Sequence, residues 1–252
     1  ALATIVQDSL GYDIGSRPLS VSNPVTSERM LGKIDWNIND QHRASFTYQG
    51  TKENGFSGVG SNTFDSAYYS TPTDLKVYTG QLFSDWSDNF STELRVNYKD
   101  YERAQNCNAG PGVGAIEFEL SAADLVGTPL EGFIAANAGE VGFDGGCDAF
   151  RQGNTFEDER LQIQGIGRLT GGDHLLTFGA EFQNYQLANL FAQDSIGTFI
   201  FEDIASLQAG IANEVTVRLP DTGNRDDALA EWGYDQLALF IQDSFQVTPN
   251  FR

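Results

Sequence analysis

The stretch KIDWNINDQHRASFTYQ, residues 33–49, has the pattern of two β-strands joined by a short polar turn. Its apolar residues fall at every second position within each half, at Ile34, Trp36, Ile38, Ala44, Phe46 and Tyr48. Alternation with a period of two is typical of a strand with one apolar and one polar face. The stretch therefore predicts an antiparallel hairpin whose turn lies at residues 39–42.

The same strand-turn-strand unit recurs along the chain. Similar patterns surround polar turns at 87–89 and 170–173, and a further strand leads from Tyr234 to a turn at 247–250. This last strand is apolar on both faces, so the sequence leaves its orientation open. Together the units predict an all-β fold with about seven antiparallel strands.

The connections between the hairpins are much longer than the turns within them. They span about 52–74, 102–156 and 188–233. Loops beyond about fifteen residues are unusual in a compact soluble domain. Outer-membrane β-barrels, by contrast, have short periplasmic turns and long extracellular loops. We therefore expect residues 1–252 to be part of one transmembrane β-barrel domain, with 102–156 and 188–233 as long extracellular loops.

Seven strands are fewer than the eight that the smallest barrels need, so this segment is not expected to close by itself. A β-sandwich is the alternative, because alternation also suits a strand that packs against a second sheet. Aromatic residues near both strand ends favour the barrel, since such residues form girdles at membrane interfaces. They are Trp36, Trp86, Phe90 and Phe245 beside the short turns, and Tyr48, Tyr98, Tyr101, Tyr185 and Tyr234 toward the long connections.

The composition excludes several functions. Among 252 residues, 15 Lys and Arg stand against 35 Asp and Glu, giving a net charge of −20 that excludes nucleic acid as a partner. An aromatic content of 12% argues against a disordered acidic tail. The first residues lack a basic segment followed by an apolar one, so we expect an internal piece of a longer protein.

No catalytic motif is present. The sequence has no GxSxG, HExxH or Walker motif, and its two histidines, His42 and His174, fall in or beside predicted turns. We therefore expect a protein that binds and gates, with no enzymatic activity and no cofactor.

Two cysteines, Cys107 and Cys147, lie in one Gly-rich acidic connection. Neither belongs to a CxxC pair, which makes a zinc site improbable. A disulfide that staples an exposed loop in an oxidising compartment is the favoured interpretation, and two separate free thiols are the alternative.

The long connections are acidic. Their carboxylates suit either solubility at the cell surface, which we favour, or the capture of a hard cation such as calcium. The best candidates for calcium are Asp221, Asp226 and Asp227, although the run around them is not an EF-hand loop.

Charged residues also alternate along the strands and could line a ligand path. They are Lys33, Asp35, Glu93, Arg95, Lys99, Arg168 and Glu181. The alternative is a wetted wall whose charges pair with one another or contact a plug.

Several stretches resemble one family. Residues 31–40 (LGKIDWNIND), 91–96 (STELRV), 174–182 (HLLTFGAEF) and 239–250 (LFIQDSFQVTPN) are similar to barrel hairpins of TonB-dependent outer-membrane receptors, in particular the Oar-like subgroup. The run 197–201 (GTFIF), followed by a short helical stretch, fits as well. The resemblance covers most of 29–252 and leaves 1–28 unassigned.

The resemblance implies a transporter in the outer membrane of a Gram-negative bacterium. Such receptors are barrels of about twenty-two strands, filled by an N-terminal plug on which the periplasmic protein TonB pulls. The implied partners are membrane lipid, the plug and remaining strands outside this chain, TonB through the plug, and an unidentified small ligand or peptide. A surface β-sandwich adhesin and a passive porin are the alternatives, and the sequence does not identify the cargo.

Overall fold

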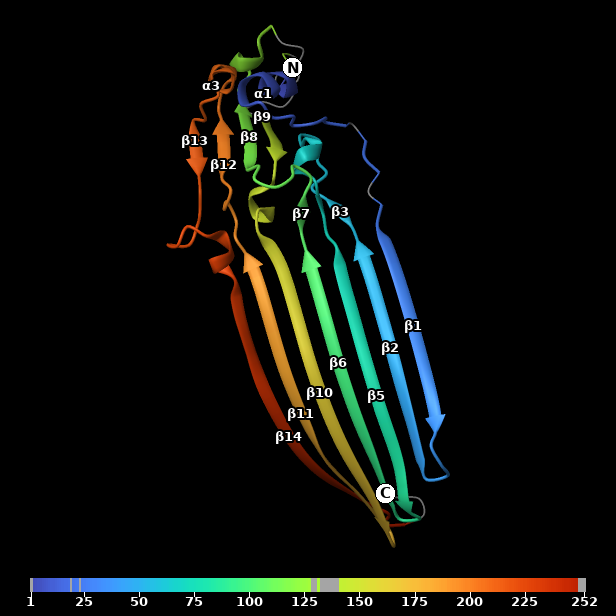
Figure 1. Cartoon of the computed structure of the whole chain (residues 1–252). Helices are drawn as coiled ribbons and strands as arrows, with labels where there is room; N and C mark the ends of the chain where they lie inside the picture. The colour runs from blue at the N-terminus through green and yellow to red at the C-terminus, as the bar shows by residue number, and fades with distance from the viewer. Residues whose placement is uncertain (1, 19, 23, 128–130, 132–140, 249–252) are drawn as a thin grey trace.

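The computed structural model describes residues 2–18, 20–22, 24–127, 131 and 141–248. Its largest element is one antiparallel sheet of seven long strands in the order β1-β2-β5-β6-β10-β11-β14 (Figure 1). These strands are β1 (Thr26–Asn37), β2 (His42–Asn54), β5 (Thr73–Ser87), β6 (Phe90–Ala104), β10 (Asn154–Gly171), β11 (His174–Phe191) and β14 (Ala230–Phe245). Within the described ranges β1 and β14 are the two outer strands and do not pair, so the sheet is open. The predicted all-β fold of seven unclosed strands is confirmed.

The predicted turns at 39–42, 87–89 and 170–173 are also confirmed, whereas the one predicted at 247–250 lies partly outside the described residues. In the first turn the side-chain Oδ1 of Asn39 accepts hydrogen bonds from the backbone N–H groups of Gln41 (2.9 Å) and His42 (2.8 Å). A short polar side chain that satisfies the turn backbone in this way is what lets two long strands reverse within a few residues. The β10–β11 turn uses Gly172, whose φ of +58° suits glycine.

Successive side chains of a strand point to opposite sides, so the register divides the sheet into two faces. We call one the apolar face because large, exposed hydrophobic side chains gather on it. It includes Ile34, Trp36, Phe46, Leu82, Leu94, Val96, Ile163, Phe178, Leu239 and Ile241. We call the other the polar face. The pairing of β14 with β11 places Leu237, Leu239 and Ile241 on the apolar face, which settles the orientation that the sequence left open.

The sandwich alternative is wrong. In a sandwich the apolar face would be buried against a second sheet. Here Leu239 is 76% exposed and Ile34 68% exposed. The cluster of buried hydrophobic residues that the structure describes contains no residue of the seven long strands.

The three long connections and the segment before β1 instead build a folded unit, which we call the cap, at the end of the sheet opposite the short turns (Figure 1). It contains a four-stranded sheet in the order β13-β12-β8-β9 and a three-stranded sheet in the order β3-β4-β7. The strands are β3 (Phe56–Ser57), β4 (Tyr69–Ser70), β7 (Asn106–Cys107), β8 (Ala115–Leu120), β9 (Val141–Gly146), β12 (Thr198–Phe201) and β13 (Glu214–Thr216). The helical segments are α1 (Leu2–Leu10), α3 (Ile204–Ala209), η1 (Asp65–Ala67), η2 (Ala123–Leu125), η3 (Ala149–Arg151) and η4 (Arg225–Ala228).

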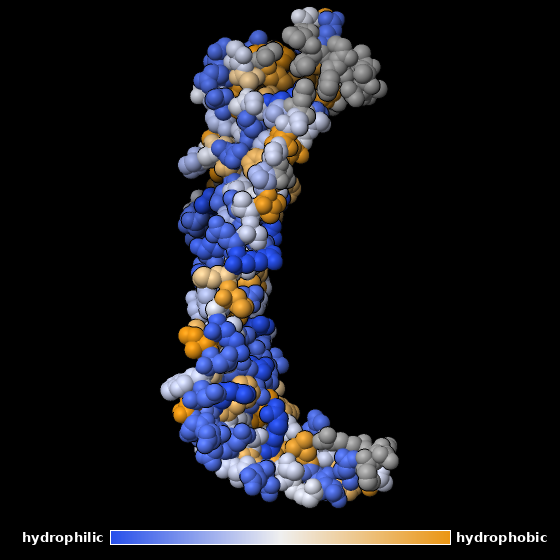
Figure 2. Space-filling model, turned by 90° about the vertical axis from the view of Figure 1, so that its right-hand side faces the viewer, coloured by the Kyte–Doolittle hydropathy of each residue, from blue (hydrophilic) through white to orange (hydrophobic). Residues whose placement is uncertain are grey.

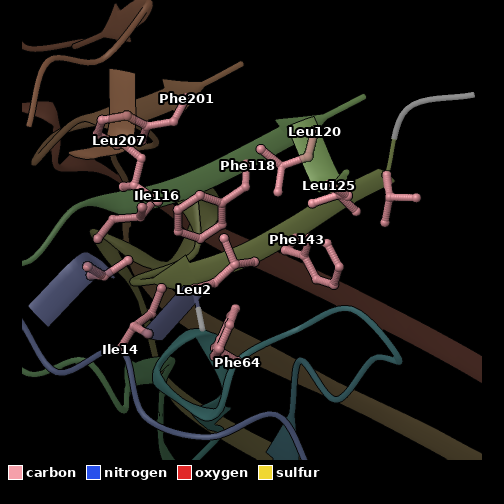
Figure 3. Packing of buried hydrophobic residues seen from close by; sticks show 12 residues of the cluster. Leu2, Ile14, Phe64, Ile116, Phe118, Leu120, Leu125, Phe143, Phe201 and Leu207 are labelled. Atoms are coloured by element: carbon pink, nitrogen blue, oxygen red, sulfur yellow. The ribbon is translucent and has the colours of Figure 1, made fainter. Parts of the chain in front are cut away.

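The cap has its own hydrophobic core (Figure 3). Phe118 of β8 is fully buried, and its ring stacks on that of Phe201 of β12 with centroids 6.2 Å apart. Val6 of α1 and Leu207 of α3 are also fully buried, and the two helices contact each other. Burial of each such side chain contributes about 1.5–3 kcal/mol, which explains why connections of this length are folded. Residues 2–16, unassigned from the sequence, thus belong to the cap.

Viewed from the β1 edge, the sheet and cap form one long body that is curved along its length (Figure 2). In the described part of the chain, no helix is both long and apolar enough to cross a membrane.

Candidate functional site: the two faces of the sheet and the cap

All seven charged residues proposed for a ligand path lie on the polar face. Lys33 and Asp35 of β1 are on the same face as Glu93, Arg95 and Lys99 of β6, as the register through β2 and β5 shows. Arg168 of β10 and Glu181 of β11 join them through the pairing of β6 with β10 and of β10 with β11.

Glu93 is the centre of an ion-pair network near the short-turn end. Its side chain is 9% exposed, and its carboxylate lies 2.8 Å from Arg95 and 3.4 Å from Arg168. Both guanidinium groups are about half exposed, at 46% and 42%. A carboxylate buried to this degree needs such partners, because an unpaired buried charge is strongly unfavourable. This pairing fits the alternative of a wall that pairs its own charges, and a ligand path along these residues stays a prediction.

Amide and hydroxyl groups fill the middle of the polar face. The carboxylate of Glu181 accepts hydrogen bonds from Gln162 (2.9 Å) and Gln164 (3.1 Å). One row further, the hydroxyl of Thr79 donates to Asn97 at 2.8 Å. These groups are capable of neutral hydrogen bonding to a ligand or to another segment of protein.

Nearer the cap, Lys99 pairs with Asp158 at 2.9 Å, and the hydroxyl of Tyr185 donates to the same carboxylate at 3.0 Å. Asp158 and the neighbouring Arg160 were missed in the sequence, because the strand pattern was recognised only from Leu161 onward. Extending the alternation backward from Arg168 in steps of two would have found both.

The apolar face is bounded by two rows of aromatic residues. At the cap side, Tyr48, Tyr78 and Tyr98 are register partners, with ring centroids 5.2 and 6.3 Å apart. At the short-turn side, the indole of Trp86 donates to the hydroxyl of Thr92 at 2.8 Å, and Trp36 lies on the same face. The strand from Thr92 to Tyr98, which separates the two rows, spans about 20 Å at about 3.3 Å per residue.

The predicted girdle is wrong for three tyrosines. Tyr101, Tyr185 and Tyr234 lie on the polar face, because their positions have the opposite parity in the register. Tyr185 and Tyr234 contact each other there, with ring centroids 5.3 Å apart. Beyond the Tyr48–Tyr98 row, the apolar face becomes charged at once, as the Lys76–Asp100 ion pair at 3.1 Å illustrates. The apolar band therefore ends sharply on the cap side.

Cys107 and Cys147 form the expected disulfide, with Cα atoms 5.4 Å apart, so the free-thiol alternative is wrong. Cys107 ends β7, and Cys147 directly follows β9. The bond thus joins the two sheets of the cap. Cys147 is 3% exposed, so this end of the disulfide is buried, contrary to the expectation of an exposed loop.

The calcium candidates lie beside and within η4. Arg225 contacts Asp226 at 3.1 Å, and the amide of Asn224 donates to Asp227 at 3.2 Å. In the described ranges, no three Asp, Glu, His or Cys side chains gather as metal ligands would. Calcium binding by Asp221, Asp226 and Asp227 stays a prediction, which a calcium titration of thermal stability tests.

The solvent side of the four-stranded cap sheet is acidic. Glu117 of β8 and Asp144 of β9 are register partners. Burial raises the pKa of the Glu117 carboxyl above its usual value of 4.5, and Asp144 and Glu119 raise it further. The pKa of Asp144 is raised as well, by loss of solvent and by the nearby Asp148. These groups repel one another, and the cap tolerates them because its apolar core lies on the opposite side of the sheet.

An outer membrane beta barrel domain model matches residues 14–252. The chain belongs to this family. Among solved structures, it is similar to the outer membrane transporter YddB from Escherichia coli, with a TM-score of 0.59 and 10% identity. The match covers 87% of this chain and 25% of that structure, so the chain spans about a quarter of its structural relative. No curated protein matches the sequence. Membership of the outer membrane beta barrel family places the seven-stranded sheet in an outer-membrane lipid environment.

Proposed function

We propose that this chain is a wall segment of a TonB-dependent outer-membrane transporter of the Oar-like kind, which takes up its ligand by energy-coupled transport. One observation carries the proposal. The open sheet has an apolar face bounded by two aromatic rows, and its opposite face is polar and paired by charges. Only a wall with lipid on one side and a wet interior on the other needs both faces.

In this arrangement the apolar face contacts lipid and the polar face lines the interior. The short turns face the periplasm, and the cap faces the outside. In the part of the chain that the structure describes, β1 pairs only with β2 and β14 only with β11 within this sheet, so their outer edges carry unpaired backbone groups, which are costly in hydrocarbon. They pair with further barrel strands of the same protein, outside this chain.

The transporter binds and gates without bond chemistry, so no enzymatic activity and no cofactor is proposed for the wall. Energy enters through a plug domain that fills the barrel and is pulled by TonB. The cap, whose connections arise from three separate hairpins, is positioned to meet a small ligand or peptide before it enters the interior.

The test of orientation uses single introduced cysteines in the complete protein, and it is possible because Cys107 and Cys147 of this chain are paired with each other. Asn97→Cys, on the polar face, is expected to react with a water-soluble maleimide in outer-membrane vesicles, because the thiolate that attacks the maleimide forms in water. Leu94→Cys, on the apolar face, serves as the matched control and is expected to be protected from the same reagent. Equal labelling of the two positions would contradict the proposed orientation.

The test of energy coupling measures ligand uptake by whole cells with and without a proton-motive-force uncoupler. Uptake by the proposed transporter stops when the gradient is dissipated. Uptake that continues unchanged would identify a passive porin instead.

A further inference from the structure

Positive and negative side chains are segregated between the two faces of the long sheet. The polar face carries more than half of the protein's Lys and Arg residues, at Arg29, Lys33, Arg43, Arg95, Lys99, Arg103, Arg160 and Arg168. Fewer acidic residues share that face, namely Asp35, Glu53, Asp85, Glu93, Asp158 and Glu181. In a protein with a net charge of −20, this is a locally basic surface.

The charged residues of the opposite face show the reverse balance. It carries two basic residues, Lys52 and Lys76, both near the cap. Its acidic residues are Glu28, Asp74, Asp100, Glu102, Glu157, Glu159, Glu231, Asp235 and Asp243. Because the remaining acidic groups lie mostly in the cap and the turns, an anion meets attraction mainly along the polar face.

Most polar-face acids are already neutralised by a partner. Glu53 pairs with Arg29 at 3.0 Å, while Glu93 and Asp158 are held by the pairs described above. Two guanidinium groups near the cap, those of Arg103 and Arg160, form no ion pair with any described residue. The Nε of Arg160 is buried from solvent and has no hydrogen-bond partner within the described part of the chain.

Aromatic rings flank these two arginines. Arg160 is the register partner of Tyr185, which contacts Tyr234. Arg103 is the register partner of Phe156, whose ring lies 6.0 Å from that of Tyr101. Rings beside free guanidinium groups offer apolar contact area close to positive charge.

We propose that Arg103 and Arg160, with these flanking rings, bind an anionic ligand that bears carboxylate groups on an apolar or aromatic frame. Guanidinium groups bind carboxylates through paired hydrogen bonds. These two lie near the cap end of the polar face, where a ligand that enters from the cap side would meet them. This inference rests on the proposed function, since it assigns a class of cargo to the interior of that transporter.

The test uses the complete outer-membrane protein in detergent and isothermal titration with three probes on one ring. They are benzene-1,3,5-tricarboxylate, the neutral 1,3,5-tris(hydroxymethyl)benzene and the cationic 1,3,5-tris(aminomethyl)benzene. The tricarboxylate is expected to bind at least tenfold more tightly than either of the others. Its affinity should weaken as salt is raised, because screening reduces the attraction.

The variant arm compares Arg103→Gln/Arg160→Gln with Lys52→Gln/Lys76→Gln, which removes the same charge from the opposite face. The arginine pair is expected to lower the affinity for the tricarboxylate at least tenfold, and the lysine pair less than twofold. Arg160→Lys, which keeps the charge and loses the planar fork, should give an intermediate loss.

Any of three results would overturn the inference. They are no binding of the tricarboxylate, tighter binding of the amine, and an equal loss of tricarboxylate affinity in the two double variants. If the arginine variant does not fold, as judged by heat-modifiable migration, the three-probe comparison on the unaltered protein still decides. The transporter proposal stands or falls separately, through cysteine labelling and the uncoupler experiment.

Discussion

Tyr78 and Tyr98 face each other across β5 and β6 on the apolar face, with ring centroids 6.3 Å apart, and Tyr48 extends the row. Two residues further toward the cap, Lys76 is paired with Asp100. The row therefore marks where the apolar band ends, as interfacial tyrosines do in membrane barrels.

The position of this row predicts how strongly a charged side chain on the apolar face destabilises the protein at different depths in the membrane. Leu94 lies between the tyrosine and tryptophan rows, so Leu94→Arg is expected to reduce the free energy of folding into bilayers by about 2–4 kcal/mol. Lys76→Arg, beyond the row, should change it by less than about 0.5 kcal/mol. Denaturant titration of the complete protein in liposomes measures both. A small effect at Leu94 would show that this face does not lie in hydrocarbon.

The Glu93 network predicts a coupling between β6 and β10. Arg168→Leu removes one partner of a carboxylate that is 9% exposed. Because both arginines are about half exposed, we expect a modest loss of stability, about 1 kcal/mol. In the background of Glu93→Gln, the same change should cost much less, since there is no charge left to pair. A double-mutant cycle measures the difference, and strictly additive losses would argue against the ion pair.

The hairpins could be predicted because their signal is local. Alternation around Asn39 and around Gly172 defines strand and turn within a few residues, and the structure places both turns as expected. Assigning side chains to one face by counting in steps of two fails where the extent of a strand is misjudged. Arg103 was assigned to a connection, yet β6 continues to Ala104, so its place on the polar face was overlooked. The expectation of Tyr101 in the girdle is wrong for a related reason, because only the pairing of β6 with its neighbours shows that this residue lies on the polar face.

The cap could not be predicted, because its contacts join distant segments. β12 pairs in parallel with β8 although about eighty residues separate them, and α1 contacts α3 from nearly the opposite end of the chain. Short strands carry too few residues for a period to be recognised. The short run from Thr198 to Phe201 and the helix after it were recognised only through a family resemblance, and the structure confirms both as β12 and α3.

The disulfide predicts that loss of the Cys107–Cys147 bond destabilises the cap and leaves the stability of the long sheet unchanged. Its two cysteines are 40 residues apart, so the bond is expected to stabilise the cap by about 2–4 kcal/mol. Cys107→Ser/Cys147→Ser should accelerate amide hydrogen exchange in β8 and β9 and leave β5 and β6 unchanged. The single variant Asn108→Ser is the control for a polar change nearby. Equal acceleration in the long strands would mean that cap and sheet unfold together.

The repulsion between Glu117 and Asp144 predicts a cap that is more stable in mild acid. Because the pKa of Glu117 is raised in the folded cap, the folded state holds this proton more tightly than the unfolded chain does. Below the unfolded value of 4.5 both states are protonated and the group imposes no penalty, and as pH rises through the folded pKa the full penalty appears. Glu117→Gln should therefore stabilise the cap at pH 7 to 8, by less than about 1 kcal/mol because solvent screens a half-exposed carboxylate, and give no gain at pH 4.

Hydrogen exchange in β8 and β9 at the two pH values measures the effect. Glu214→Gln, an exposed residue of β13, is the matched control for loss of one negative charge, and a gain of equal size at both pH values would contradict the repulsion.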